Sequence, residues 1–221
     1  MSTNETTSTS TTDTTTTTST TNIKKNEQQD KPFIPTCVFI SLVYVKYHNR
    51  YLLVQEVNTR YFIPAGKLEI GESFAQGALR ETLEESGVKV ELKGILRIDH
   101  SPGFRGYPSR MLAYFLAEPI IDQTIEMIEI DNLEYPKPKA SPDHHSLCAK
   151  WFTIDQIKQL SVEANLRSDS IPNVIAYIES NQPVYPLSML ALEGSKWTIP
   201  NSDGTESPPT KEKGFLRKLL R

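Results

Sequence analysis

The chain has 221 residues, a formal net charge of -3 and a hydrophobic fraction of 38%. This length suits one well-packed domain with tails. Because no basic surplus is available to neutralise a phosphate backbone, a nucleic-acid polymer is not expected as a partner, whereas a small anionic substrate is compatible with metal ions that screen the protein's own acids.

Cysteines and targeting features add little to this picture. Cys37 and Cys148 are far apart and have neither the spacing of metal ligands nor that of a disulfide framework, so we expect reduced thiols. The N-terminus lacks the basic and apolar regions of a signal peptide, and no apolar run is long enough to cross a membrane. We therefore expect a cytoplasmic location and no membrane partner; the sequence does not indicate an oligomeric state.

The two ends of the chain differ in composition from its middle. Residues 1–31 are mostly Thr and Ser and offer little apolar surface to offset the entropy of ordering, which predicts a disordered tail. We interpret it as a dispensable extension; a phosphorylated or glycosylated tail is the alternative. The folded domain is expected over residues 32–194, followed by a flexible C-terminal tail over residues 195–221.

The first half of the domain begins with apolar strands. Residues 37–45 are β-branched and apolar, which predicts a buried strand. Residues 47–50 supply a turn, and residues 51–55 return as a second strand, so the two should form a hairpin. A short strand over residues 61–63 leads into a loop rich in Gly and Glu over residues 65–72.

A helix is predicted to follow this loop. Ser73 and Gln76 have the spacing of a capping box, and Gly87 stands where a left-handed residue ends a helix. Helical spacing predicts an apolar side made by Ala75, Leu79, Thr82 and Leu83.

The remaining elements alternate between strands and helices. Strands are expected over residues 88–98 and 111–117. Residues 119–145 are acidic and rich in proline, and a loop of this length is usually functional or disordered. The last elements are expected to be a strand over 147–152, a helix opening at Thr153 with Gln156 and ending at Leu160, and a helix over 171–179 with Pro172 in its first turn.

Three acids of the first helix suggest metal chemistry. Glu81, Glu84 and Glu85 are spaced i, i+3 and i+4, so they share one side of the helix and repel each other. Lys67 and Arg80 are too few to cancel this repulsion, whereas Mg²⁺ or Mn²⁺ would cancel it and prefers carboxylate oxygens.

A solvated charged helix is the alternative explanation for these acids. Gly66 and Gly71 flank Glu69 and Glu72 in the preceding loop, and glycines there allow backbone carbonyls and carboxylates to approach one ion closely. The glycines therefore favour a metal site over a solvated helix.

The segment from Gly66 to Val88, GKLEIGESFAQGALRETLEESGV, resembles the Nudix box. Gly66 is followed by Glu72 and then by the run from Arg80 to Val88, with every fixed position at the expected spacing. The one departure is Thr82 in the first aliphatic place, which affects packing more than chemistry. The resemblance covers about a tenth of the chain.

The resemblance implies an α+β Nudix fold, a mixed β-sheet sandwiched between helices in an α/β/α arrangement. It also implies that Mg²⁺ or Mn²⁺ is held by the carbonyl of Gly66 and by the catalytic glutamates Glu81, Glu84 and Glu85. One of these glutamates would act as general base on the attacking water, and the sequence does not distinguish which. Glu72 and Arg80 would form a structural ion pair.

The activity implied by the resemblance is metal-dependent hydrolysis of a diphosphate linkage. The substrate would be a small nucleotide-like molecule, a nucleoside diphosphate linked to another moiety, such as an ADP-ribose-like or oxidised nucleotide. The alternative is a Nudix-fold module that binds a nucleotide without cleaving it. Because no box glutamate is lost, hydrolysis is favoured.

Substrate contacts are predicted from residues beyond the box. Arg97 and Arg110 could reach phosphate oxygens. Pro102 stands about fifteen residues past the box and resembles a proline of the ADP-ribose subgroup, although the acidic residue expected after it is missing. Further candidates are the acids Glu118, Asp122 and Glu126, the aromatics Tyr61, Phe62, Phe104 and Tyr107, and the histidines His100, His144 and His145.

Overall fold

The computed structural model describes residues 36–104, 107–141 and 146–195. The tails expected over residues 1–31 and 195–221 lie outside these ranges, apart from residue 195. The pair His144 and His145 lies outside them too. The domain limits set from composition therefore stay a prediction.

Strands and helices alternate along the described chain. The strands are β1 (Cys37–Tyr47), β2 (Arg50–Glu56), β3 (Tyr61–Phe62), β4 (Ala65–Lys67), β5 (Val90–Ser101), β6 (Ser109–Pro119), β7 (Met127–Ile130), β8 (Leu133–Pro136) and β9 (Ser146–Thr153). The helices are α1 (Phe74–Ser86), α2 (Ile154–Val162) and α3 (Ile171–Glu179), with a 3₁₀ turn, η1, at Leu187–Leu190.

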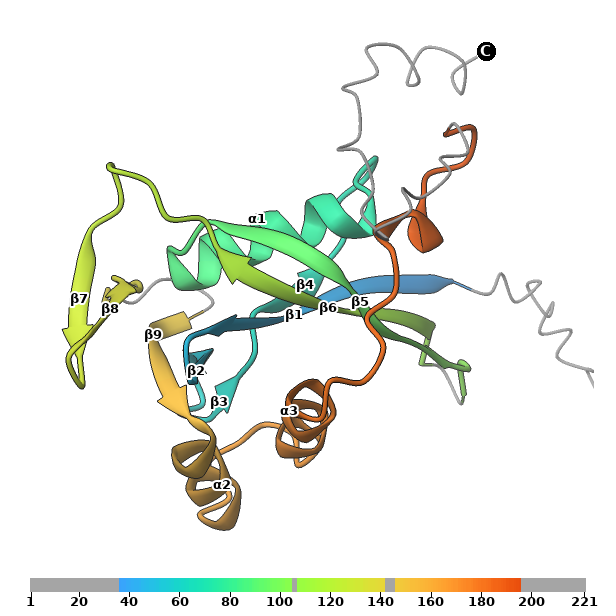
Figure 1. The fold of residues 1–221 in the computed structure, drawn as a ribbon. Coiled ribbons are helices and arrows are strands. Elements are labelled where there is room, and N and C mark those ends of the chain that lie inside the picture. The colour runs from blue at the N-terminus through green and yellow to red at the C-terminus, as the bar shows by residue number, and fades with distance from the viewer. Residues whose placement is uncertain (1–35, 105–106, 142–145, 196–221) are drawn as a thin grey trace, which may run out of the picture. The chain divides into compact units, whose positions relative to one another are not determined.

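Among the described residues, seven strands form one mixed sheet in the order β3-β2-β1-β6-β5, with β4 paired to β1 and β9 paired to β2. The β1–β6 pair is parallel and joins Cys37 to Ser109 at one end and Val45 to Ala117 at the other. The other pairs of this sheet are antiparallel. Figure 1 shows β1 and β6 running through the middle of the sheet.

Helices cover both faces of this sheet. Val43 and Val45 of β1 belong to a core that includes Ala78 of α1. Leu42 and Tyr44, which alternate with them, belong to a second core that includes residues of α2 and α3. Figure 1 shows α1 on one side of the sheet and α2 and α3 on the other. Because both faces are buried, β1 reads as a continuous apolar run. The predicted α/β/α arrangement is confirmed.

Most predicted elements are found within a few residues of their expected limits. The hairpin of β1 and β2 closes with Tyr47 opposite Arg50, and His48 in its turn has a φ of 51°. The helix over 171–179 has the predicted limits, with Pro172 in its first turn. Part of the glycine-rich segment expected to be loop is instead the short strand β4, whose Gly66 pairs with Ser41 of β1.

The acidic segment over residues 119–145 is not the open loop that its composition suggested. It contains the antiparallel hairpin β7–β8, in which Ile130 lies opposite Leu133. The two turn residues, Asp131 and Asn132, have φ values of 51° and 60°, which suits a two-residue hairpin turn and which Asp and Asn tolerate better than other side chains. Ile128 and Ile130 pack against the core on the α1 side.

The side of α1 that packs on the sheet differs in part from the prediction: Thr82 is buried as predicted, whereas Leu79 and Leu83 are not. The buried residues are Gly77, Ala78, Thr82 and Ser86. Leu79 and Leu83 stay 41% and 43% exposed. Small side chains let the helix lie close to the sheet, and a Cβ added to Gly77 would come within 3.3 Å of the Leu68 side chain. The buried Thr82 hydroxyl donates to the carbonyl of Ala78 at 2.7 Å.

None of the helices in the described ranges is long and apolar enough to cross a membrane.

Candidate active site

The loop from β4 into α1 brings acidic side chains against a glycine. The Ser73 hydroxyl accepts from the amide of Gln76 at 3.2 Å, and the Gln76 side chain accepts from the amide of Ser73 at 2.9 Å, so the predicted capping box fixes the start of α1. A Cβ added to Gly66 would lie 1.9 Å from the Glu81 carboxylate. The Glu81 carboxylate therefore lies directly against the backbone of Gly66, and any side chain at position 66 would displace it.

Arg80 joins the loop to the helix. Its guanidinium donates to both Glu72 carboxylate oxygens at 2.7 and 2.9 Å and to the carbonyl of Lys67 at 2.9 Å. It also lies 2.8 Å from Glu81 and 3.1 Å from Glu84. The hydrogen bonds with Glu72 raise the pKa of Arg80 and lower the pKa of Glu72. The ion pair expected between Glu72 and Arg80 is thus present as a bidentate contact that braces the loop.

Glu85 is turned toward β4. Its carboxylate accepts from the amide of Ala65 at 3.0 Å. The pKa of Glu85 is raised to about 7, mainly by burial and also by the negative charges of Glu81 and Glu56, while the Ala65 amide and Arg167 lower it. A cation beside these carboxylates would lower this pKa again, so the cluster has the electrostatics of a cation site.

Two residues of this cluster were missed by the sequence analysis. Glu56 ends β2, and Arg167 lies in the segment between α2 and α3; their side chains form an ion pair at 2.5 Å. The Arg167 guanidinium also lies 4.7 Å from the centre of the Phe62 ring. Glu56 is the last residue of β2, two positions after a run of five buried residues, so it is the polar end of a core strand. No local feature pointed to Arg167.

The three box glutamates do not form a ready-made cage. In the part of the chain that the structure describes, no group of three or more His, Cys, Asp or Glu side chains is arranged to hold a metal. The Glu84 carboxylate lies at Arg80 and is 58% exposed. Glu81 and Glu85 both lie against β4, at Gly66 and Ala65. Because Mg²⁺ commonly takes one or two carboxylates and keeps several waters, the donors at Gly66, Glu81 and Glu85 fit such an ion.

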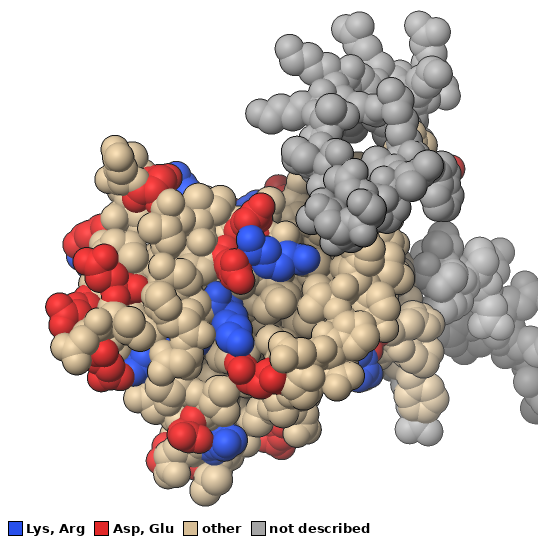
Figure 2. Space-filling model, viewed as in Figure 1, with Lys and Arg blue, Asp and Glu red and all other residues tan. Residues whose placement is uncertain are grey.

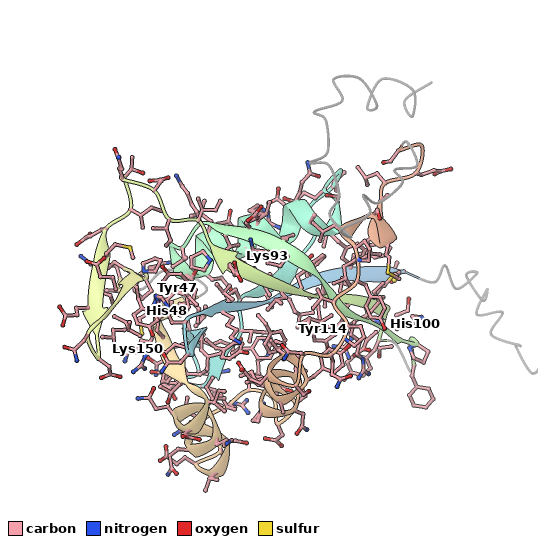
Figure 3. All side chains as sticks on the ribbon, viewed as in Figure 1. Tyr47, His48, Lys93, His100, Tyr114 and Lys150 are labelled. Atoms are coloured by element: carbon pink, nitrogen blue, oxygen red, sulfur yellow. The ribbon has the colours of Figure 1, made fainter. Side chains whose placement is uncertain are left out.

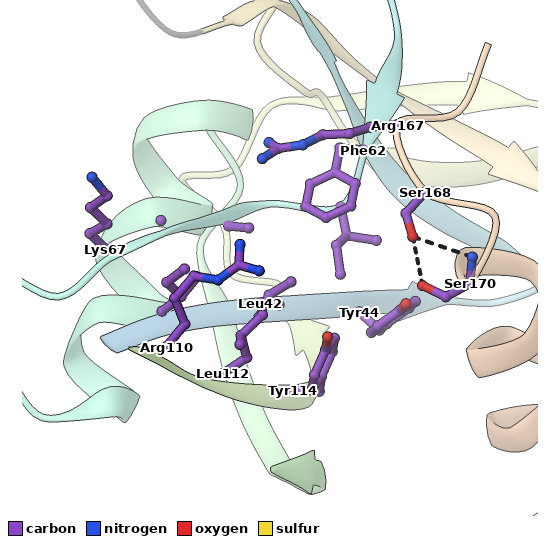
Figure 4. Close-up of a pocket in the computed structure, with 14 residues that line it drawn as sticks. Leu42, Tyr44, Phe62, Lys67, Arg110, Leu112, Tyr114, Arg167, Ser168 and Ser170 are labelled. Atoms are coloured by element: carbon purple, nitrogen blue, oxygen red, sulfur yellow. Dashed lines mark hydrogen bonds between the residues drawn. The ribbon is translucent and has the colours of Figure 1, made fainter. Parts of the chain in front are cut away.

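A pocket of about 410 Å³ opens beside the glycine loop. Its lining combines the loop residues Ala65 and Gly66, the basic residues Lys67, Arg110 and Arg167, the aromatic residues Tyr44, Phe62 and Tyr114, and the remaining residues Ile40, Leu42, Ile63, Leu112, Ser168 and Ser170. Figure 4 shows the side chains of Arg110 and Arg167 entering the pocket from different elements, with the Phe62 ring beside Arg167. None of the described residues that line it is acidic.

Of the three substrate contacts predicted beyond the box, the structure brings one to this pocket. Arg110, on β6, lines it. Arg97 is on β5, pairs with Asp99, has a 73% exposed side chain and is not among the lining residues. Pro102 is exposed just beyond the end of β5 and is also absent from the lining.

The other candidates have local partners or lie elsewhere. The acids outside the box are engaged nearby, Glu118 with Lys93 at 3.3 Å, Asp122 with Thr124 at 2.5 Å and Glu126 with Lys137 at 2.5 Å. Phe62 alone of the predicted aromatics lines the pocket; Tyr61 packs on Phe152, and Phe104 and Tyr107 are exposed. Figure 3 shows His100 at the opposite end of the sheet from Tyr47 and His48.

The chain therefore has a mixed sheet between helices, in which the short strand β4 leads into the acidic helix α1 beside a basic pocket. Residues 38–174 match the family model described as the NUDIX domain. The chain belongs to the Nudix family.

Curated proteins resemble the chain over about two thirds of its length. The NAD-capped RNA hydrolase NudC of Vibrio cholerae serotype O1 is 27% identical over 155 residues, which cover 68% of this chain and 49% of that protein. The protein of the same name from Vibrio vulnificus is 27% identical over 154 residues, covering 68% of this chain and 50% of that protein. The chain thus spans about half the length of these curated relatives.

A solved structure gives a similar result. A NUDIX hydrolase from Nitrosomonas europaea superposes with a TM-score of 0.55 at 25% sequence identity, covering 72% of this chain and 100% of the other. The Nudix fold expected from the box is therefore confirmed.

Proposed function

We propose that this protein is a metal-dependent pyrophosphohydrolase that cleaves the diphosphate linkage of a nucleoside diphosphate attached to another group. The observation that carries the proposal is the pocket beside Gly66, in which three basic side chains and three aromatic rings meet and which contains no acidic lining residue among those described. Basic groups suit phosphates, and aromatic and aliphatic walls suit a base or sugar. The volume of about 410 Å³ is that of a pocket for a small molecule.

The residues of the Nudix box would have different roles in catalysis. Glu81, Glu85 and the carbonyl of Gly66 would hold a Mg²⁺ or Mn²⁺ ion, and the exposed Glu84 carboxylate, which lies at Arg80, would supply a further ligand. When bound, the ion lowers the pKa of the attacking water and neutralises charge on the diphosphate. One box glutamate accepts the proton from that water. The ion pair of Glu72 and Arg80 holds the loop against the helix.

The pocket residues would bind the rest of the substrate. Arg110 and Arg167 enter the pocket from different elements and would contact phosphate oxygens. Within the described ranges, Lys67 and Arg110 form no side-chain ion pair, so their charge is available to an anion. Phe62 carries Arg167 on its ring and would pack against a base or ribose. Arg97 and Pro102 are not placed at this pocket, so the proposed binding set is Lys67, Arg110 and Arg167 with Phe62.

The proposed substrate is a small nucleotide rather than a polymer. The net charge is -3, and on the face shown in Figure 2, outside the grey atoms, basic and acidic side chains are intermixed without a broad basic area. Such a surface offers little to a phosphate backbone. Because similar proteins carry the name NAD-capped RNA hydrolase, a capped RNA belongs in the substrate panel.

The test is a substrate panel with the full chain and either Mg²⁺ or Mn²⁺. It contains ADP-ribose, an oxidised guanine nucleotide, a dinucleoside polyphosphate, NADH and an NAD-capped RNA, with products separated by chromatography. We expect cleavage of at least one small nucleotide at its diphosphate and no cleavage after chelation of the metal. Faster turnover of the capped RNA than of any free nucleotide would overturn the assignment to small substrates.

Removing one box carboxylate should abolish turnover without unfolding the protein. Glu85→Gln and Glu84→Gln are each expected to lower kcat by more than about 100-fold. Loss of a residue that hydrogen-bonds to a metal ligand lowers activity by about 10- to 100-fold, and loss of the ligand itself should lower it more. Glu91→Gln is the matched control, since Glu91 is an exposed acid on β5 paired with Lys93. Full activity of both box variants would contradict the proposed catalytic role. Tight nucleotide binding without turnover by the unaltered chain would support a binding module instead.

A further inference from the structure

The C-terminal end of α1 has backbone groups that the helix itself cannot pair. The last four carbonyls of an α-helix have no partner within the helix. In α1 these belong to Leu83, Glu84, Glu85 and Ser86. Gly87, in the left-handed region with a φ of 73°, donates its amide to the carbonyl of Leu83 at 2.8 Å. The local C-cap therefore accounts for one carbonyl of the four.

The other three carbonyls are paired by residues that follow the β7–β8 hairpin. The Lys139 ammonium donates to the carbonyl of Glu84 at 3.2 Å, and the Lys139 amide donates to the carbonyl of Ser86 at 2.7 Å. The Ser146 hydroxyl donates to the carbonyl of Glu85 at 3.3 Å. Thus the carbonyls of the last two box glutamates are both held by side chains from outside the box.

Lys139 also lies in close contact with the cap itself. A Cβ added to Gly87 would lie 3.4 Å from the backbone nitrogen and the Cβ of Lys139. The Lys139 ammonium also donates to the Ser146 hydroxyl at 3.3 Å, so the two residues are joined to each other. A positive charge at this end of a helix also interacts favourably with the partial negative charge of the carbonyls.

The segment that carries Lys139 is itself attached firmly to the domain. The carbonyl of Lys139 accepts from the amide of Ala149 on β9 at 2.8 Å. The Trp151 indole donates to the carbonyl of Pro136 at 2.8 Å, and the buried Tyr135 hydroxyl donates to Asn49 at 2.8 Å. These contacts fix Lys139 relative to the sheet, so the sheet and α1 are linked through this residue.

We infer that Lys139 and Ser146 are positioning residues, which hold the last turn of α1 so that Glu84 and Glu85 present their carboxylates correctly for the metal. The inference rests on the proposed function, because it concerns the same acidic helix. It assigns a positioning role to residues 127–139, the acidic hairpin segment, which contains β7, β8 and Lys139: the segment would orient the proposed metal ligands through the backbone of α1. Groups behind a metal ligand typically change metal affinity or activity by about 10- to 100-fold.

Lys139→Met is the decisive variant, because it keeps the apolar stem and removes the donor. We expect Mn²⁺ binding to the full chain, measured by calorimetry without nucleotide, to weaken about tenfold. With substrate, kcat should fall by a similar factor at fixed Mn²⁺ while KM for the nucleotide is unchanged. Lys139→Arg should restore most of both. Lys137→Met is the matched control, since Lys137 belongs to the same segment but pairs with Glu126.

Further measurements keep the inference falsifiable if Lys139→Met folds poorly. Ser146→Ala removes the hydroxyl that donates to the Glu85 carbonyl and accepts from Lys139, and leaves the Lys139 contact with the Glu84 carbonyl in place; we expect it to weaken Mn²⁺ binding in the same direction by a smaller factor. If Mn²⁺ binding by Ser146→Ala and by any folded Lys139→Met equals that of the unaltered chain, the inference is wrong. If the unaltered chain binds Mn²⁺ but hydrolyses nothing in the panel, the proposed function fails while the metal titrations still decide the positioning role.

Discussion

The two ends of α1 are secured in different ways. At the first end, Ser73 and Gln76 pair each other's backbone amides across three residues of sequence. At the second end, the carbonyls of Glu84 and Glu85 are paired by Lys139 and Ser146, 55 and 61 residues further along the chain. One end is closed by a local motif and the other by the tertiary structure.

The difference has a functional consequence, because the two ends carry different parts of the site. The local cap starts the helix after the glycine loop, where Arg80 and Glu72 brace the backbone. The distant cap lies at the turn that bears Glu84 and Glu85. We therefore expect changes in the acidic hairpin segment to affect the proposed metal ligands, and changes at the first end to act mainly on stability.

The largest effect on stability is expected at Gly87. Gly87→Ala places a side chain at a φ of 73°, which costs about 1–2 kcal/mol in an L-residue. Urea unfolding measures the change. Because the new methyl group lies against Lys139, the effects of Gly87→Ala and Lys139→Met should not add, whereas those of Ser73→Ala and Lys139→Met should. Additivity at both ends would remove the distinction between them.

A smaller effect is expected at the local cap. Ser73→Ala removes the acceptor for the Gln76 amide and should destabilise the protein by about 1 kcal/mol. Mn²⁺ binding of the folded protein should stay within about twofold, because a capping bond fixes the first turn and not the last. The same urea and calorimetry series provides both values. A tenfold loss of Mn²⁺ affinity in Ser73→Ala would show that the first end also positions the ligands.

The smallest effect should depend on pH. The Arg80 guanidinium holds the pKa of Glu72 below its ordinary value of 4.5, so this pair stabilises the folded protein above that pH and loses its contribution as the pH falls through the lowered pKa. Glu72→Gln should therefore reduce the unfolding free energy near neutral pH, by no more than about 1 kcal/mol, and the difference should shrink below pH 4.5. Unfolding curves at several pH values give the profile, and a difference that grows on acidification would contradict this account.

The elements whose causes are local were predictable from residues alone. The capping boxes at Ser73 and Thr153 and the left-handed Gly87 each depend on neighbours within a few positions. The apolar run of β1 predicted a buried strand. The packing side of α1 was not predictable in this way, because Gly77, Ala78 and Ser86 are buried for their small size rather than their hydrophobicity.

The residues of the proposed active site also fall into those that the sequence predicted and those that only the fold brought together. The box supplied Gly66, Glu81 and Glu85, because a contiguous motif fixes their spacing. Glu56 and Arg167 entered only through folding, since β2 and the segment between α2 and α3 meet the box in space and not in sequence. Arg110 could be proposed as a cation on a strand, but its place at the pocket depends on the parallel pairing of β6 with β1.

The sequence by itself determined the family, the start of α1 and the acids available to a metal, because each of these follows from residues close together in the chain. The tertiary structure decided which cations surround the pocket, which side of α1 is buried and what pairs the carbonyls of Glu84 and Glu85. Those outcomes depend on hydrogen bonds and contacts between segments far apart in the chain. No local pattern specifies such partners, because their positions are set only when the sheet and the acidic hairpin segment pack together.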